Sequence, residues 1–231
     1  MLTVRVARVD EVAGLDDGET VPAWLGAEER RRWTTLGAVR RREFAAGRRL
    51  LRDTLARATG LPADIWEISA QAGAAPLVQG PATVRASLSH RLGWMAAAVS
   101  DGAVGIDVEP ARPPRSDPAG RAALMLAPAE LVAWYALAPG LREAALRTAW
   151  TAKEAWFKAS PPHTTAWDFR RVVARACAPA DANVRVWEAS PLHVAVCSVD
   201  ARELARVECA GLGSIAAAST FWHVSRGGAP A

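Results

Sequence analysis

The sequence predicts an α+β fold of two similar lobes in a pseudo-twofold arrangement, each a small, mainly antiparallel sheet with packed helices. Three observations predict it. Apolar patterns of helix and strand period follow one another in the order helices, strands, helices, strands. A proline-rich segment, ARPPRSDPAG, separates the two runs. The 231 residues also exceed what one domain of roughly 100 to 150 residues needs. We therefore expect lobes at residues 1–109 and 110–231, a duplication inferred from element order alone.

The first lobe opens with a half-buried strand, since Leu2, Val4 and Val6 alternate with outward residues. A helix is expected to start at residues 27–29, where acidic side chains suit the positive end of the helix dipole. A second helix follows and ends at Gly60. Apolar residues and Gly/Pro turns then predict strands at residues 65–69, 84–89, 94–100 and 104–109.

The second lobe is expected to start with helices and to end with strands. One helix begins near Pro128, since proline is favoured in a first turn, and the next covers residues 141–159. The expected strands lie at residues 170–175, 184–188 and 192–199.

The composition favours a globular, cytoplasmic protein. Apolar residues make up 51% and charged residues 23%, enough for a sizeable core. The opening segment has strand period rather than that of an export signal, and Asp101 and Asp107 interrupt the most apolar later stretch, so no membrane helix is expected. Cys177, Cys197 and Cys209 fit neither a disulfide framework nor a zinc site, and are interpreted as buried thiols in a reduced compartment.

Arginines are concentrated in one N-terminal stretch of a chain whose net charge is +4. This stretch, residues 30–52, is expected to meet phosphates or an acidic partner. A nucleic-acid binder is the competing interpretation. It is disfavoured because acidic residues such as Glu43 and Asp53 alternate with the arginines and stacking aromatics are not interleaved.

The first candidate motif is GIDVE, residues 105–109. On a strand, Asp107 and Glu109 project to the same side, and two carboxylates on one face repel unless a cation or a proton separates them. Hard oxygen ligands favour magnesium, usually with a phosphate as co-ligand. The competing interpretation is an exposed strand end that becomes polar before the linker.

The second candidate motif is WTAKEAWFKAS, residues 150–160. Trp150, Glu154 and Lys158 are spaced by four and share one helical stripe, with Lys153 close by. Glu154 offers a third carboxylate, and the two lysines offer cations for a bound pyrophosphate. An ordinary surface Glu–Lys pair beside a buried aromatic residue is the alternative.

The third candidate motif is ASLSH, residues 86–90. We expect Leu88 to face the core, and Ser89 and His90 to reach the exit loop, where a phosphate or nucleotide could be gripped. The alternative is a histidine with a structural role only.

In this order, the three motifs and the arginine-rich helix upstream resemble the surfactin-type (Sfp-type) 4'-phosphopantetheinyl transferases, over about residues 28–158. The resemblance implies a monomeric, magnesium-dependent enzyme of secondary metabolism that transfers the phosphopantetheine of coenzyme A to a serine of an acyl or peptidyl carrier protein. Polyketide or nonribosomal peptide assembly would supply that carrier.

The resemblance also implies roles for individual residues. Asp107, Glu109 and Glu154 correspond to the magnesium ligands, and Glu154, or a water beside it, to the base. Lys158 would neutralise the phosphate under attack, Lys153 and His90 the neighbouring phosphates, and Ser89 would contact the nucleotide. Arg48, with Arg41 nearby, would hold the 3'-phosphate of the coenzyme. The catalytic set is therefore expected to be Glu154, Lys158 and Asp107, with Asp107 and Glu154 reachable from solvent.

Two departures from the family's pattern leave an alternative open. Residues 73–76 read GAAP, without the usual cation, and Pro161-Pro162 replaces a glycine-rich stretch. A degenerate member that binds coenzyme A or a carrier protein without turnover is the competing function.

Overall fold

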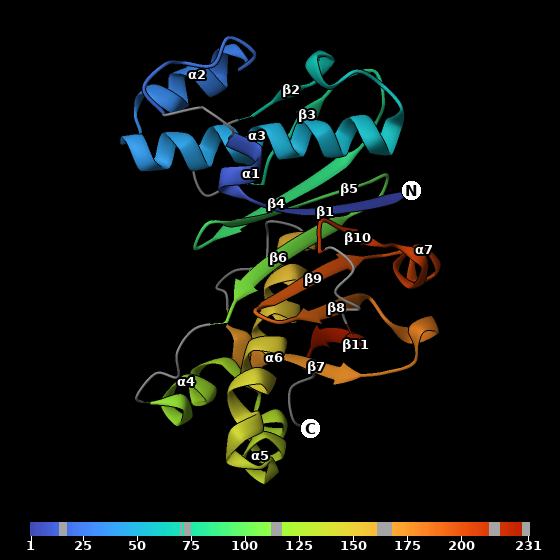
Figure 1. Ribbon diagram of the computed structural model, residues 1–231. Coiled ribbons are helices and arrows are strands. Elements are labelled where there is room, and N and C mark those ends of the chain that lie inside the picture. Colours follow the sequence, from blue (N-terminus) through green and yellow to red (C-terminus); the bar gives the residue numbers. More distant parts are fainter. Residues whose placement is uncertain are drawn as a thin grey trace.

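The computed structural model describes residues 1–13, 18–69, 71, 75–111, 117–160, 168–212 and 218–227. Its two lobes are stacked, with the long helix α3 over the upper lobe and α6 in the lower one (Figure 1). The predicted α+β class with two lobes, each containing a mainly antiparallel sheet, is confirmed. Half of the predicted linker (residues 112–116), together with Gly73 and the Pro161-Pro162 pair, lies outside the described residues.

The first sheet has the strand order β10-β1-β5-β4, and only the β1–β10 pair is parallel. Its strands are β10 (Cys209–Ala210), β1 (Leu2–Arg8), β5 (Trp94–Ser100) and β4 (Arg85–Arg91). The helices of this lobe are α1 (Val9–Ala13), α2 (Ala27–Thr34) and α3 (Ala38–Thr59), followed by a short 3-10 turn, η1 (Ala63–Ile65). A small separate ladder joins β2 (Glu67–Ile68) to β3 (Val78–Gln79).

The second sheet is antiparallel, with the order β6-β9-β8-β11-β7. Its strands are β6 (Val104–Pro110), β9 (Leu192–Ser198), β8 (Val184–Ala189), β11 (Ala218–Arg226) and β7 (Val172–Ala176). The helices of this lobe are α4 (Pro118–Met125), α5 (Pro128–Ala136), α6 (Pro139–Ala159) and α7 (Ala201–Arg206), with the short turns η2 (Phe169–Arg171) and η3 (Pro179–Asp181). The sequence did not predict α1, α4, α7, β10 or β11.

The sheets do not follow a division at residue 109. Strand β6 precedes that residue but pairs with β9 in the second sheet, whereas β10 comes late in the chain and pairs with β1. We propose that the second lobe begins at β6.

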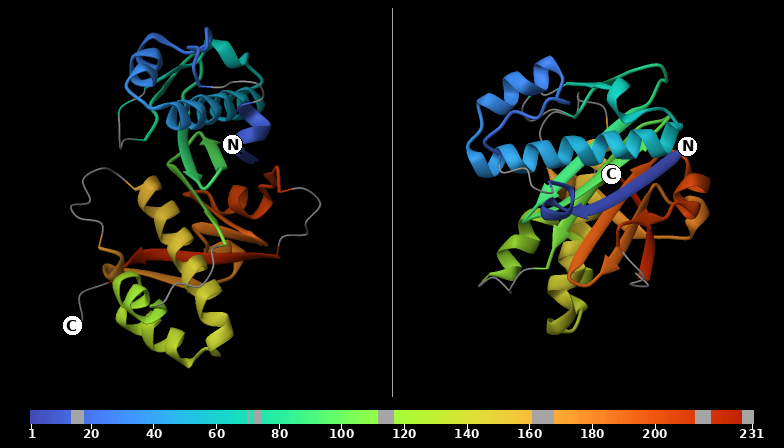
Figure 2. Two further views of the ribbon diagram at one scale, coloured as in Figure 1. Left: turned by 60° about the vertical axis from the view of Figure 1, so that its left-hand side comes forward. Right: turned by 45° about the horizontal axis from the view of Figure 1, so that its top comes forward.

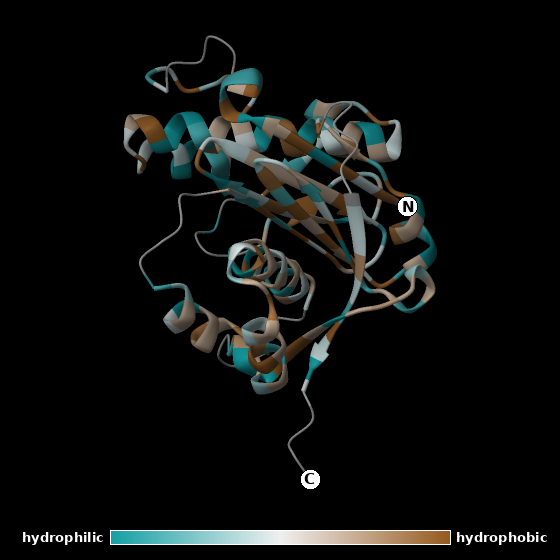
Figure 3. Cartoon of the chain, turned by 60° about the horizontal axis from the view of Figure 1, so that its bottom comes forward, coloured by the Kyte–Doolittle hydropathy of each residue, from teal (hydrophilic) through white to brown (hydrophobic). Residues whose placement is uncertain are grey.

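The two sheets face each other, and one long helix covers the outside of each. Val4 and Ala96 of the first sheet share a buried cluster with Ile106 and Val194 of the second. Helix α3 packs on the other face of the first sheet, and α6 on the other face of the second, as both views in Figure 2 allow the reader to follow. Figure 3 shows many hydrophobic residues along the strands and hydrophilic residues on α3. Within the described ranges, no helix is both long and apolar enough to cross a membrane.

This layering places β4 and β6, the edge strands of their sheets, against each other. An edge strand has backbone groups without a ladder partner. The backbone NH of Ile106 on β6 donates to Ser87 Oγ on β4 at 3.1 Å. The β4–β6 contact therefore includes a polar bond beside the apolar cluster that the two sheets share.

Candidate active site

Helix α6 reaches the β6 carboxylates because Gly105 lets it come close. A Cβ atom at Gly105 would overlap the Ala155 carbonyl oxygen and the Ala159 nitrogen. Asp107 alternates with Ile106, which faces the other sheet, so Asp107 turns toward α6. The sequence GIDVE thus supplies both the close approach of the helix and the carboxylates beneath it.

Asp107 is the centre of the cluster. Its Oδ1 accepts hydrogen bonds from Ser89 Oγ at 2.8 Å and from Lys158 Nζ at 2.7 Å. Its Oδ2 is buried and has no hydrogen-bond partner among the described residues. The residue is only 4% exposed, so the expectation that Asp107 is readily reached by solvent is wrong. A buried carboxylate oxygen without a partner is costly, which makes it a candidate ligand for a cation.

Glu109 lies at the outer end of the same strand face. Trp150 Nε1 on α6 donates to its Oε1 at 3.2 Å, and Arg91 Nε on β4 lies 3.8 Å from its Oε2. The Trp150 ring stacks on Phe169 with centroids 4.5 Å apart. Trp150 is therefore half-buried and bonded to the carboxylate cluster.

Glu154 interacts electrostatically with both β6 carboxylates. Its pKa is raised to about 7: burial is the largest cause, the negative charges of Asp107 and Glu109 also raise the pKa, and the positive charges of Lys158 and Arg91 oppose that rise. Its Oε2 lies 3.9 Å from Lys158 Nζ. The structure thus brings together Asp107, Glu109, Glu154 and Lys158, as the sequence predicted.

These residues fit a divalent cation chemically. Three carboxylates that repel one another, one with an unpartnered buried oxygen, form the hard-oxygen donor set that magnesium prefers. They are not preassembled around an ion, however. Among the described residues, no three His, Cys, Asp or Glu side chains are already grouped as metal ligands. The Lys158 ammonium instead supplies the positive charge next to Asp107.

Residues 103–197 match a family model, that of the 4'-phosphopantetheinyl transferase superfamily. The matched segment is less than half of the chain. It contains Asp107, Glu109, Glu154 and Lys158, but neither the serine and histidine of β4 nor the arginine-rich helix. No curated protein matches the chain. The match supports a phosphopantetheine transferase role and leaves the subfamily open.

Lys153 lies in the matched segment, residues 103–197, but outside this cluster. It is fully buried, and its Nζ donates to Glu130 Oε2 at 2.5 Å and to the carbonyl oxygens of Met125 and Phe169 at 2.9 and 3.1 Å. Glu130 also accepts from the Ala174 backbone NH. This ammonium joins α4, α5, α6 and η2, so the structure does not support a phosphate-binding role for Lys153.

Arg48 and Arg41 are also held inside the first lobe. Arg48 is 8% exposed, lies 3.7 Å from Glu29 and covers the Phe44 ring at 5.0 Å, although its buried Nη1 has no partner among the described residues. Burial lowers its pKa. Arg41 stacks over the Trp33 ring at 4.3 Å. Arg48 is buried and Arg41 is half-buried, and their roles at the 3'-phosphate stay predictions.

His90 is exposed at the end of β4, next to cations that sequence reasoning missed. Arg40 Nη1 lies 3.5 Å from His90 Nε2 and also donates to Glu43 at 2.7 Å. Partial burial of the ring lowers the His90 pKa; the charges of Arg40, Lys158 and Arg91 act in the same direction, and Glu43 opposes them. A helix residue that reaches a strand end leaves no periodic signal in the sequence, which is why Arg40 could not be singled out from its neighbours.

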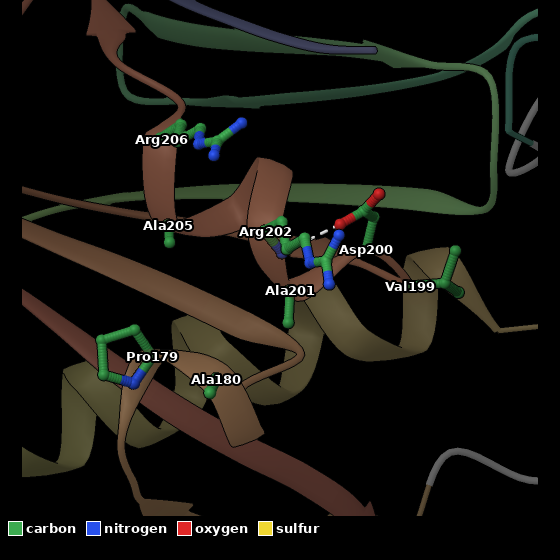
Figure 4. A pocket seen from close by; sticks show the side chains of 8 residues that line it. All are labelled: Pro179, Ala180, Val199, Asp200, Ala201, Arg202, Ala205 and Arg206. Carbon is green, nitrogen blue, oxygen red and sulfur yellow. Dashed lines mark hydrogen bonds between the residues drawn. The ribbon is translucent and has the colours of Figure 1, made fainter.

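A separate hollow of about 870 Å³ lies beside α7 and η3, away from these residues (Figure 4). Its one carboxylate, Asp200, caps α7 by accepting from the backbone NH groups of Arg202 and Glu203 at 2.8 and 3.1 Å. Alanines, Pro179 and Val199 line most of the rest. The hollow therefore lacks the paired carboxylates of the Asp107 cluster.

The three cysteines are free, in line with the prediction of unpaired thiols. Cys197 is buried, and burial raises its pKa to about 12. Cys177 and Cys209 are half-buried, so the prediction that all three thiols are buried is wrong for these two.

Proposed function

We propose that the protein is a holo-carrier-protein synthase, which transfers 4'-phosphopantetheine from coenzyme A to a serine of an acyl or peptidyl carrier protein and releases 3',5'-ADP. One observation carries the proposal: within the matched domain, Asp107 and Glu109 of β6 meet Glu154 and Lys158 of α6, and an Asp107 oxygen is left free. The Sfp-type subfamily, a monomeric state and a cytoplasmic location stay predictions.

The reaction forms a bond between the serine oxygen and the β-phosphorus of coenzyme A and breaks the bond from that phosphorus to the oxygen of 3',5'-ADP. Glu154 is suited to accept the serine proton, because a pKa of about 7 leaves it partly ionised at neutral pH. Lys158 is placed to donate hydrogen bonds to the phosphate oxygens on which charge develops.

Asp107, Glu109 and Glu154 would hold magnesium, which supplies charge neutralisation at the diphosphate when bound. Arg40 and His90 mark the rim of the same cluster, where they offer donors to the remaining phosphates of the coenzyme. Exposed arginines of α2 and α3 add a positive field that would attract an acidic carrier domain.

The test is incubation of the protein with coenzyme A, magnesium and a panel of apo carrier proteins from fatty-acid, polyketide and peptide assembly, followed by intact mass spectrometry. A gain of one phosphopantetheine that requires magnesium supports the proposal. A folded enzyme that modifies no carrier contradicts it.

The non-catalytic alternative gains support from Lys153, because its burial removes one expected phosphate cation. Calorimetry with coenzyme A in the same buffer separates the two functions. Coenzyme A binding without product on any carrier favours the non-catalytic member.

A further inference from the structure

Two serines of β4 lie at the seam between the lobes, and each bonds to a different group of β6. Ser87 and Ser89 pair in register with Ala98 and Ala96, so both point from the first sheet toward the second. Ser87 Oγ accepts from the Ile106 backbone NH, whereas Ser89 Oγ donates to Asp107 Oδ1. They are 3% and 6% exposed.

The hydroxyl of Ser89 is already engaged. Its one proton goes to Asp107 Oδ1 at 2.8 Å, and Lys158 Nζ donates to its oxygen at 3.2 Å. A phosphate at neutral pH mostly accepts hydrogen bonds, so a partner for it needs a free donor. Ser89 has no second proton to give, which argues against the nucleotide contact that the family resemblance suggested.

Ser89 and Lys158 act on the same carboxylate oxygen. Both bond to Asp107 Oδ1, while Oδ2 is buried without a partner among the described residues. Two donors on one oxygen fix the rotation of the carboxylate and leave the other oxygen presented. Groups that orient a metal ligand in this way typically change metal affinity or activity by about 10- to 100-fold.

We propose that Ser89 is a positioning residue that orients Asp107 so that Oδ2 is offered to the divalent cation. The inference rests on the proposed function only in taking Asp107 as a metal ligand. It assigns Ser89 to the metal side of the site rather than to the nucleotide side, so the two affinities should separate in a variant.

The experiment measures two affinities in wild type, Ser89→Ala and Ser87→Ala. Mn²⁺ binding to the protein alone is followed by electron paramagnetic resonance, and coenzyme A binding in EDTA by calorimetry. Ser87→Ala is the matched control, since it also removes a buried serine hydrogen bond to β6 but none to Asp107.

Ser89→Ala is expected to weaken Mn²⁺ binding about tenfold or more and to leave the coenzyme A affinity in EDTA within about twofold. Ser87→Ala should lower the melting temperature without changing either affinity. Ser89→Thr, which keeps the hydroxyl, should restore Mn²⁺ binding.

Weakened coenzyme A binding in EDTA with unchanged Mn²⁺ affinity in Ser89→Ala would overturn the inference in favour of a nucleotide contact. Equal losses of Mn²⁺ affinity in Ser87→Ala and Ser89→Ala would also overturn it, since they would report general loosening of the seam. Wild type that binds no Mn²⁺, even with coenzyme A added, would contradict the proposed metal site itself, a result distinct from a failure of Ser89→Ala alone.

Discussion

Two lysines on α6, five residues apart, occupy opposite kinds of buried site. Lys153 is fully buried, and its ammonium is saturated by a carboxylate and two carbonyl oxygens. Lys158 keeps 24% of its side chain exposed and shares Asp107 with Ser89, in a cluster where one carboxylate oxygen has no partner among the described residues. The Lys153 site, whose hydrogen bonds are all made within the protein, links several helices. The Lys158 site, the unsaturated one, has a carboxylate oxygen that could bind a ligand.

The same contrast separates the two long helices. On α3, Arg52 makes a two-pronged salt bridge with the fully buried Glu29, whose Oε2 also accepts from the Gly26 backbone NH. On α6, Glu154 is pushed to a pKa of about 7 by burial and by neighbouring carboxylates. The contrast lies in the carboxylates: both oxygens of Glu29 accept hydrogen bonds from Arg52, whereas Glu154 has a raised pKa among like charges.

The largest effect is expected at the unsaturated cluster. Glu154→Gln removes a carboxylate and the candidate base while keeping the shape of the side chain, so transfer to a carrier should fall by about 100- to 10,000-fold. Single-turnover mass spectrometry measures it, and near-normal turnover would remove Glu154 from the mechanism.

At the saturated cluster the loss should be in stability rather than chemistry. Lys153→Met leaves Glu130 without its buried cation, which should cost about 3 to 5 kcal/mol of unfolding free energy, measured by urea denaturation. Coenzyme A affinity of the folded variant should match wild type. A folded, stable Lys153→Met variant that no longer binds coenzyme A would restore the phosphate-binding role.

Substitution of Glu154 should stabilise the protein at high pH, whereas substitution of Lys153 should destabilise it. Its pKa in the folded protein, about 7, lies above the ordinary value of 4.5, so the folded state binds the proton more tightly and loses stability as pH rises between those values. In EDTA, Glu154→Gln should therefore be more stable than wild type at pH 8, by up to about 3 kcal/mol, and the difference should shrink toward pH 5. Melting curves across this range check it, and a constant difference would contradict the assigned shift.

The smallest effect is expected at the rim. Arg40→Gln should raise the KM for coenzyme A about tenfold, the loss of roughly one charge-assisted hydrogen bond, with little change in kcat. Arg49→Gln, an exposed arginine on the same helix, is the matched control. Equal effects of the two substitutions would indicate a general field rather than a contact.

Much of this site could be predicted from local patterns. Strand alternation placed Asp107 and Glu109 on one face, and the four-residue spacing placed Glu154 and Lys158 on one stripe. Lys153 precedes Glu154 by one position and so points about 100° away from it. The spacing indicates that the two side chains point in different directions. It does not indicate that Glu130 and two carbonyl oxygens lie where they accept hydrogen bonds from Lys153.

Long-range pairing set the limit of prediction. A strand pattern shows which side chains alternate on β4, but not that α3 covers one face and the edge of β6 the other. Ser89 was therefore predicted to be a residue of the exit loop. The pairing of β6 with the second sheet and of β10 with the first also left no local signal in the sequence. Arg48 was assigned to a phosphate because its partner Glu29 lies 19 positions earlier in the chain.

The central claim is that carboxylates from β6 and α6 hold one divalent ion together with the coenzyme. Mn²⁺ titration by electron paramagnetic resonance in the presence of coenzyme A tests it most directly, with Asp107→Asn and Glu154→Gln beside wild type and with coenzyme A alone as the blank. The account predicts one protein-dependent Mn²⁺ per chain in wild type and none in either variant. Full Mn²⁺ occupancy in both variants, or none in wild type, would contradict it.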